Sequence, residues 1–522
     1  MLKDNILSKQ KTFLLSLIVG MALLIHSPDN LSSSSFKAYA QISSFEEPSL
    51  MPQTEAVTSY YDALLKAPLI VSQTTIVGLV FSHIFFQRVI RNRIQPHHNR
   101  NNSNMMEIID DVNSYLRPLK RLFIILLSCG VAMLVSATSL FLLQALSLSS
   151  ELGMDVGTTF TILSSTPVGP ILNIRIITSL IIIVSSILYY IFERSSTKTV
   201  LDSHDNSYSS PKNKTGKKGG VLSSSLLYIV MVTGAASIFS NSMISHNTAL
   251  SFLPSLAISL DWLHFMAVSM WLGGLFYISS MLLMRIRLFI QKNSNINGTV
   301  SRSLNATTVH YTSYFLALLL PYFSLIATIS LGIIGVTGLY MAWIHLHTAE
   351  AIFTSSYGNI LTIKLLLILP MVVLGGYHQI KLHGSLVTIA SLNEYKQGQQ
   401  KEKINAYSME SSNDRKKIPF SLKNDPAGKF SKTIKVESFI GIGVLIAASF
   451  LTITSPPSIS LQESQISQGE ESQQDYIPSF DSFTVLAIIL SLAVVFGSFI
   501  YFEKSKKQLR NTIAYFEGIS NR

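Results

Sequence analysis

The sequence predicts an all-α protein that crosses a membrane many times as a bundle of helices. Of its 522 residues, 48% are hydrophobic and only 13% are charged, whereas roughly a quarter would be charged in a typical soluble protein. The apolar residues also fall into blocks of about 20, the length at which a helix crosses a bilayer. Nine such blocks follow the N-terminal one, at 67–90, 121–146, 171–192, 221–243, 257–284, 315–345, 359–380, 436–455 and 483–502.

Residues 1–40 have the pattern of a secretory signal peptide. A basic start and a short apolar core, MLKDNILSKQKTFLLSLIVGMALLI, are followed by AYAQ, where we expect cleavage after Ala40. The stretch between the core and this site is long, so an uncleaved anchor is the alternative. A short outer segment, 41–66, then leads to the first span.

The distribution of Lys and Arg predicts which side of the membrane each loop faces. Neither residue occurs in the loops 147–170, 244–256, 346–358 and 456–482, whereas the segments 91–120, 193–220, 285–314, 381–435 and the tail from Lys504 are basic. Because cationic loops stay in the cytoplasm, the mature N-terminus is predicted outside the cytoplasmic membrane and the C-terminus inside the cell. The net charge of +11 therefore belongs to the cytoplasmic face and does not indicate nucleic-acid binding.

The polar segments are too short or too polar to form further domains. The inner loops 193–220 and 385–435 are rich in Ser, Asn, Lys, Gln and Gly, a composition typical of disordered linkers. The outer segments are too short to bury a core. The single cysteine, Cys129, lies in the second span, which excludes a disulfide framework and a Cys-x-x-Cys metal site. Nucleotide-binding, nucleophile-elbow and His-Glu-x-x-His motifs are absent, so we do not expect an enzyme.

Five His and Met side chains are predicted near the outer rim of the bundle. Met243 and His246 are three residues apart after the fourth span, His264 lies about one turn inside the fifth, and Met341 and His345 are four apart at the end of the sixth. Imidazole and thioether groups together suit copper, particularly Cu(I). The alternative for each residue is capping of a helix end or apolar packing, and spacing alone does not show that the five converge.

Several ionisable residues are also predicted inside the spans. Asp261 lies one turn before His264, and Arg175 and Lys364 lie near the outer ends of the third and seventh spans, against the usual charge bias. We expect these two cations to pair with carboxylates such as Asp261, with snorkelling to headgroups as the alternative.

Toward the inner face, three more ionisable residues fall within spans. Glu437 opens the eighth span and is interpreted as a helix N-terminal charge. His83 and His378 are candidates for an inner exit site or, alternatively, for packing residues.

A series of motifs resembles the copper resistance protein D (CopD) family. HFMAVSMWLGGLFYI resembles its His-then-Trp-Leu-Gly-Gly element, and the resemblance continues through YFSLIATISLGIIGVTGLYMAW, TSSYGNILTIKLLLIL and VESFIGIGVLIAASFLTITSPP. SHNTA resembles a Ser/Gly-His-Ala element, with Asn247 and Thr248 departing from it, and STPVGPILNIRI resembles a Thr-x-x-Gly…Arg element. The resemblance covers 67–457; the acidic outer loop 458–482 and the last span with its basic tail, 483–522, lie beyond it.

The resemblance implies a protein of copper homeostasis or resistance that moves copper inward without ATP. It also implies a copper-binding partner outside the membrane, such as a CopC-like protein. His264 would then be a copper ligand, Asp261 would orient its imidazole, and Gly273 and Gly274 would let another helix approach closely.

Two other functions remain open at this stage. A b-type cytochrome would hold haem between two His at matched depth, for which His83 and His378 are the candidates. A copper-delivery or assembly factor would bind the ion without translocating it.

The topology predicts the fate of four Asn-x-Ser/Thr sequons. Asn101, Asn213, Asn297 and Asn305 all fall in segments assigned to the cytoplasm, so none should carry a glycan when the protein is made in a glycosylating host. Mass spectrometry of the purified protein checks this. A glycan on Asn213 would invert the predicted orientation.

Overall fold

A computed structural model gives the fold of most of the bundle. It describes residues 52–94, 119–166, 168–202, 215–245, 254–283, 301–346, 348, 350–378 and 426–458, and isolated positions from 381 onward. Within these residues the chain is helical and contains no strand, which confirms the predicted fold class. The predicted signal peptide, residues 203–214 and 385–425 of the two long inner loops, the acidic outer loop after Ser458 and all but isolated positions of the ninth span lie outside the described residues.

Eight helices of the described chain are long and apolar enough to cross a membrane. They are α3 (Pro52–Ile94), α5 (Leu119–Leu152), α7 (Val168–Asp202), α8 (Thr215–Ser242), α9 (Pro254–Phe276) with its π-helical continuation η3 (Tyr277–Leu282), α11 (Ser301–Leu346), α13 (Ser356–Tyr377) and α15 (Pro426–Leu451). They correspond to the first eight predicted spans. Most are longer than the apolar blocks, because polar residues extend the helical hydrogen bonding beyond the hydrophobic window.

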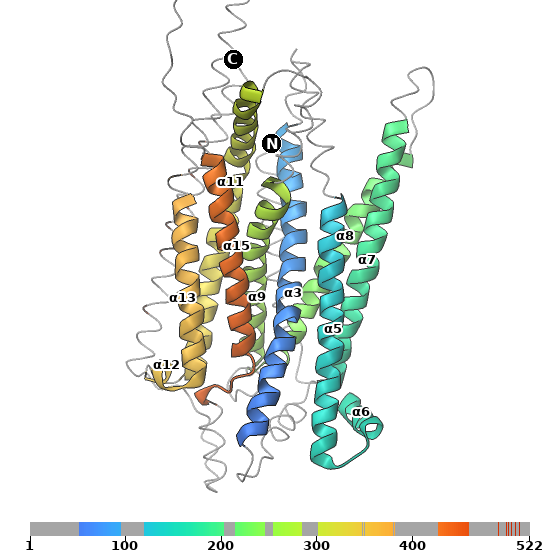
Figure 1. The fold of residues 1–522 in the computed structure, drawn as a ribbon, viewed down its shortest axis with the longest axis vertical. Coiled ribbons are helices and arrows are strands. Elements are labelled where there is room, and N and C mark those ends of the chain that lie inside the picture. Colours follow the sequence, from blue (N-terminus) through green and yellow to red (C-terminus); the bar gives the residue numbers. More distant parts are fainter. Residues whose placement is uncertain are drawn as a thin grey trace, which may run out of the picture.

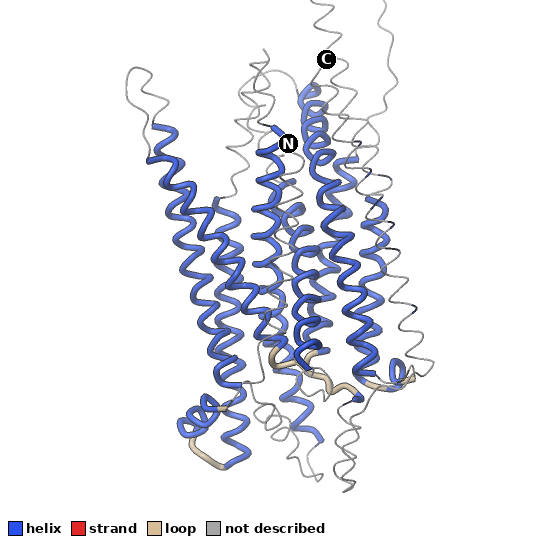
Figure 2. The backbone as a smooth tube through the Cα atoms, turned by 180° about the vertical axis from the view of Figure 1, so that it is seen from behind, coloured by secondary structure: helices blue, strands red, loops and turns tan. Residues whose placement is uncertain are grey.

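Two short helices mark one end of the bundle. Consecutive spanning helices run in opposite directions, and α6 (Val156–Ser165) and α12 (Ala351–Thr354) both lie where the chain turns back at the same end (Figure 1). We call this the α6/α12 end; the charge pattern predicts that it faces outside. Figure 2 shows the described loops gathered there. The sequence did not predict α6, whose N-terminus is capped by the Asp155 carboxylate, which accepts from the Gly157 amide at 2.9 Å.

Helix α3 occupies the centre of the bundle. It packs against α5 and α8 on one side and against α9 and α15 on the other. As Figure 1 shows, α5, α7 and α8 therefore form one group of helices, and α9, α11, α13 and α15 form a second. The largest cluster of buried apolar side chains draws on both groups and includes Leu79 and Phe86 of α3, Leu126 of α5 and Leu272 of α9.

Glycines allow α3 and α9 to approach closely, as the sequence predicted for Gly273 and Gly274. A Cβ atom on Gly273 would overlap the backbone of Gly78 on α3, and a Cβ on Gly78 would overlap the backbone of α9 at Ser269. A side chain on Gly274 would meet the ring of Phe323 on α11. Small residues at such crossings let two backbones pack directly, which stabilises helix association in lipid.

Adding one methyl group at this crossing should weaken the bundle. Gly273→Ala must push α9 away from α3, and such overpacking costs about 1–3 kcal/mol of unfolding free energy. We expect thermal unfolding of the detergent-purified protein to occur at a lower temperature. Gly443→Ala in α15 is the matched control, because its Cβ would meet Leu367 at an ordinary 3.8 Å. Equal unfolding temperatures for both variants would contradict the close crossing.

Candidate functional site

His264 lies on α9 against α11, where a single threonine defines its protonation. Its Nδ1 is 2.8 Å from the hydroxyl oxygen of Thr337. That hydroxyl donates its one proton to the Ile333 carbonyl at 2.6 Å, so toward the imidazole it can only accept. Nδ1 therefore carries the ring proton, and Nε2 of the neutral imidazole keeps its lone pair. Thr337 is not among the predicted site residues, although a hydroxyl one turn before Met341 in an apolar helix was a usable signal.

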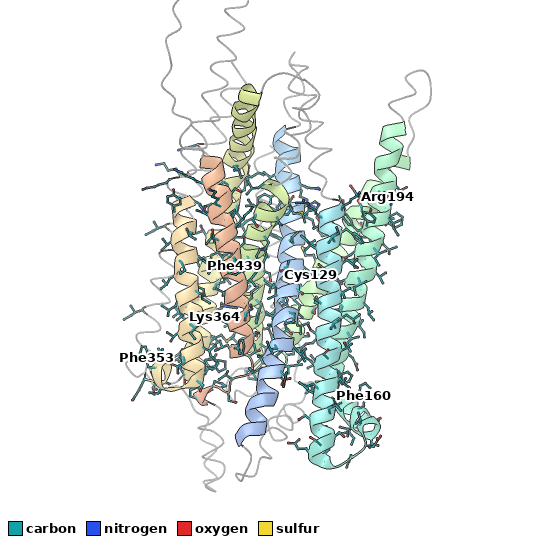
Figure 3. The ribbon with its side chains drawn as sticks, in the orientation of Figure 1. Cys129, Phe160, Arg194, Phe353, Lys364 and Phe439 are labelled. Atoms are coloured by element: carbon teal, nitrogen blue, oxygen red, sulfur yellow. The ribbon has the colours of Figure 1, made fainter. Side chains whose placement is uncertain are left out.

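Asp261 lies one turn before His264 but interacts mainly with other helices. Its carboxylate is beside Ser242 at the end of α8 and interacts electrostatically with Lys364 of α13. Lys364 is half-buried between exposed apolar neighbours, and Figure 3 shows it in the half of α13 nearer to α12. Lys364 thus acts electrostatically on Asp261, and the expected ion pair between them stays a prediction. The residue that contacts Nδ1 of His264, however, is Thr337 and not the expected Asp261.

Three residues on one face of α11 continue this polar region toward the α6/α12 end. Thr337, Met341 and His345 are spaced four residues apart, so they lie one above another on the helix. His345 is buried, and its ring lies edge-on to that of Tyr357 on α13, with the ring centroids 5.8 Å apart. Tyr357 in turn interacts electrostatically with Asp261.

Helices α9, α11 and α13 thus bring several of the predicted site residues to one region, which we call the α9–α11–α13 cluster. It consists of Asp261, His264, Thr337, Met341, His345, Tyr357 and Lys364.

The remaining predicted ligands lie at the end of α8. Met243 follows α8 directly, is half-buried, and adjoins Ser242, the neighbour of Asp261. His246 lies outside the described residues. Within the part of the chain that the structure describes, no three His, Cys, Asp or Glu side chains are close enough to hold a metal ion. A complete copper-binding set would therefore have to draw on the thioethers of Met243 and Met341 or on His246.

Arg175 belongs to a different polar group. It lies about two turns into α7, which begins at Val168, and its Nε donates to the Ser240 hydroxyl on α8 at 3.3 Å. Its guanidinium acts electrostatically on Lys66 of α3, which also interacts with Asp62 one turn earlier. These contacts place Arg175 among α3, α7 and α8, on the opposite side of α3 from α13.

The two predicted inner histidines are both buried and both contact protein groups. His83 of α3 lies edge-on to Tyr277 of η3, and its Nδ1 is 3.5 Å from the Tyr277 hydroxyl. His378, at the end of α13, uses both ring nitrogens: Nε2 is 2.6 Å from the Thr433 hydroxyl, and Nδ1 is 3.4 Å from the Glu437 carboxylate. In this arrangement both ring nitrogens of His378 face protein groups inside the bundle. These contacts therefore favour the packing interpretation of His378 and do not fit the haem alternative, which needs both histidines as ligands.

Comparison with protein families identifies one part of the chain. The family model described as copper resistance protein D (CopD) matches residues 317–406. The match includes the α11 and α13 residues of the α9–α11–α13 cluster, whereas Asp261 and His264 precede it. It is shorter than the range 67–457 over which motifs resemble this family. Comparisons with curated proteins and with solved structures gave no match.

The interaction between Asp261 and Lys364 can be measured with a double-mutant cycle. Asp261→Asn and Lys364→Met should each lower the unfolding temperature, because each leaves a charge of the cluster without its partner. The double variant should recover part of the loss, with a coupling energy of about 0.5–3 kcal/mol. Lys120→Met, which removes an exposed lysine, controls for the loss of a charge as such. Strictly additive losses would show that the two residues do not interact.

Proposed function

We propose that this protein moves copper ions inward across the cytoplasmic membrane without ATP, because residues 317–406 match the family model described as copper resistance protein D and because its spanning helices form a membrane bundle. Copper is the transported ion in this proposal and not a resident cofactor. The protein would serve copper homeostasis or resistance, and a CopC-like copper-binding protein would supply the ion from outside.

The main observation that supports the proposal is the tautomer of the His264 imidazole. A neutral imidazole whose Nδ1 proton is held by Thr337 presents an unprotonated Nε2, which is the form that binds a metal. Metal-bound histidines commonly donate their second ring N–H to a protein oxygen, and Thr337 is that oxygen here. His264 lies nearly three turns from the start of α9, in the half of the helix nearer to the α6/α12 end.

The neighbouring donors favour a soft, singly charged ion. Met341 lies one turn from both Thr337 and His345 on α11, and Met243 lies beside the Asp261 neighbour Ser242. Thioether and imidazole donors together select copper over hard cations such as Mg²⁺ or Ca²⁺. Lys364 acts on both Asp261 and His264, so this cluster is not strongly negative. A site of low net charge suits Cu(I) better than a divalent ion.

Copper titration of purified variants tests the site. His264→Ala and His246→Ala should each lower copper affinity steeply, because each removes an imidazole from a small ligand set, while Met341→Leu should lower it less. Asp261→Asn removes the negative charge beside Lys364 and should also lower copper affinity. Unfolding temperatures of the same samples separate lost ligands from lost stability. Unchanged copper binding in both His264→Ala and His246→Ala would end the proposal.

Matched controls separate the ligand role from a general effect of mutation. Thr337→Val removes the acceptor of the Nδ1 proton and should also weaken copper binding by about 10–100-fold. Thr328→Val, on the same helix, removes a hydroxyl that bonds only the Ser324 carbonyl of its own helix, at 2.8 Å, and should leave affinity unchanged. His98→Ala, in the predicted cytoplasmic segment, controls for the loss of an imidazole. Equal effects of Thr337→Val and Thr328→Val would show that Thr337 does not tune a ligand.

Transport itself requires a vesicle assay. Liposomes that contain the purified protein should accumulate copper, and the uptake should be lost in His264→Ala. Running the assay with and without a proton gradient identifies the coupling ion. Copper binding without uptake under every gradient would instead indicate the copper-delivery alternative.

A further inference from the structure

Glu437 lies deep in the bundle, in the half away from the α6/α12 end. Its side chain is 1% exposed. The sequence placed Glu437 at the start of the eighth span, as a charge at a helix N-terminus, and this is wrong. Helix α15 begins at Pro426, so Glu437 is about three turns inside the helix and away from the free N–H groups that stabilise an anion. An ionisable side chain buried in a membrane bundle usually pairs with another polar or ionisable group.

The partner is His378, and a hydrogen bond fixes which of its nitrogens carries the proton. The Thr433 hydroxyl donates to the Lys429 carbonyl at 3.0 Å, so toward His378 it acts as an acceptor. This arrangement favours the tautomer of the neutral imidazole in which Nε2, 2.6 Å away, carries the proton. The Phe430 ring, with its centroid 5.0 Å from that of His378, packs against the imidazole and holds it in place. Nδ1 is then the unprotonated nitrogen, and Nδ1 is the atom that faces Glu437.

Two atoms with lone pairs thus face each other across 3.4 Å in a buried site. They are Nδ1 of His378 and Oε2 of Glu437, and among the described residues Oε2 has no hydrogen-bond partner. A carboxylate beside an unprotonated nitrogen in a low-dielectric interior is strongly unfavourable. One added proton, on either atom, makes the pair neutral overall and turns the contact into a hydrogen bond. The geometry therefore calls for one proton more than a carboxylate and a neutral imidazole contain.

Titratable and charged groups in this half come from several helices, and they include the cations Arg88 of α3, Lys381 after α13 and Arg121 of α5, which donates to the Ser280 carbonyl of η3 at 3.4 Å. Gly375 on α13 keeps the space before Oε1 open, because a Cβ there would lie 3.8 Å away. The helices packed against α15 contribute His378 from α13, His83 from α3, Tyr277 from η3 and Tyr322 from α11 as titratable groups in this half. Among the described side chains, the charged and histidine residues of α9 and α11 lie at the α6/α12 end instead. On α15 itself, the cations are Lys429, Lys432 and Lys435, toward the helix start.

A π-helix borders the pair and links it to α3. The Ser438 hydroxyl, next to Glu437, lies 3.2 Å from the Ser279 hydroxyl of η3, and Tyr277 of η3 contacts His83. Single π-helical turns within α-helices occur frequently at functional sites, because they interrupt the regular backbone hydrogen bonds. Polar groups therefore extend from the Glu437–His378 pair across η3 toward the centre of the bundle.

We propose that Glu437 and His378 form a proton-binding site that holds one exchangeable proton between Oε2 and Nδ1. The proton comes from water and returns to water: binding takes the pair from a net charge of −1 to neutral, and release reverses this. Because release leaves a buried negative charge, it requires a compensating cation. If the protein transports copper as proposed, the proton of this pair is the ion that is exchanged for copper. Only this consequence rests on the proposed function.

Infrared difference spectroscopy of the protein in liposomes, without copper, tests the site directly. Changing the pH should produce paired carboxylic-acid and carboxylate bands that shift in D₂O. These bands should disappear in Glu437→Gln, remain with a different midpoint in Glu437→Asp, and shift in His378→Asn. Glu350→Gln, which replaces an exposed glutamate beside α12, is the matched control and should leave them in place.

Identical pH-dependent spectra for the unmodified protein and Glu437→Gln would overturn the proposal. If Glu437→Gln does not fold, bands with unchanged midpoints in both Glu437→Asp and His378→Asn would overturn it equally. Since these samples contain no copper, the result does not depend on the proposed transport.

Discussion

The interior of a lipid-embedded helix bundle contains no bulk water, so a polar side chain there must be satisfied by another helix. This constraint accounts for the contacts of the ionisable residues inside the described spans. Lys364 interacts with Asp261 across α13 and α9, Arg175 with Ser240 across α7 and α8, and Glu437 faces His378 from the neighbouring helix. Each contact joins two helices, so the pairing of polar groups and the packing of the bundle depend on each other.

The glycine crossing between α3 and α9 makes these pairings geometrically possible. Because Gly78 and Gly273 bring the two backbones into contact, α9 lies close to the central helix and also packs against α11. The same helix continues into η3, which contacts His83 of α3 and Ser438 of α15. One helix thus contributes to both polar regions, at opposite ends of the bundle.

At both ends of the bundle a threonine hydroxyl hydrogen-bonds a histidine, but the nitrogen that is left unprotonated faces a different environment. In each, a threonine donates its hydroxyl proton to a carbonyl of its own helix and accepts from an imidazole. Thr337 selects Nδ1 of His264 and leaves Nε2 unprotonated in the α9–α11–α13 cluster, which suits a metal ligand. Thr433 selects Nε2 of His378 and turns the unprotonated nitrogen toward a buried carboxylate, which suits a proton. The hydrogen-bond partner of each histidine therefore decides whether its unprotonated nitrogen suits a metal ion or a proton.

The sequence alone determined the fold class, the first eight spans and the set of polar residues from which a site could be built. These features are local: a hydrophobic block of about 20 residues forms a spanning helix wherever it occurs, and an ionisable residue within it stands out. The sequence also identified Gly273 and Gly274 as positions at which another helix can approach closely. Only the tertiary structure decided which polar residues meet. Thr337, Tyr357 and the Glu437–His378 contact depend on how helices rotate and pack against one another, and helical periodicity fixes a residue's face without fixing which helix that face meets.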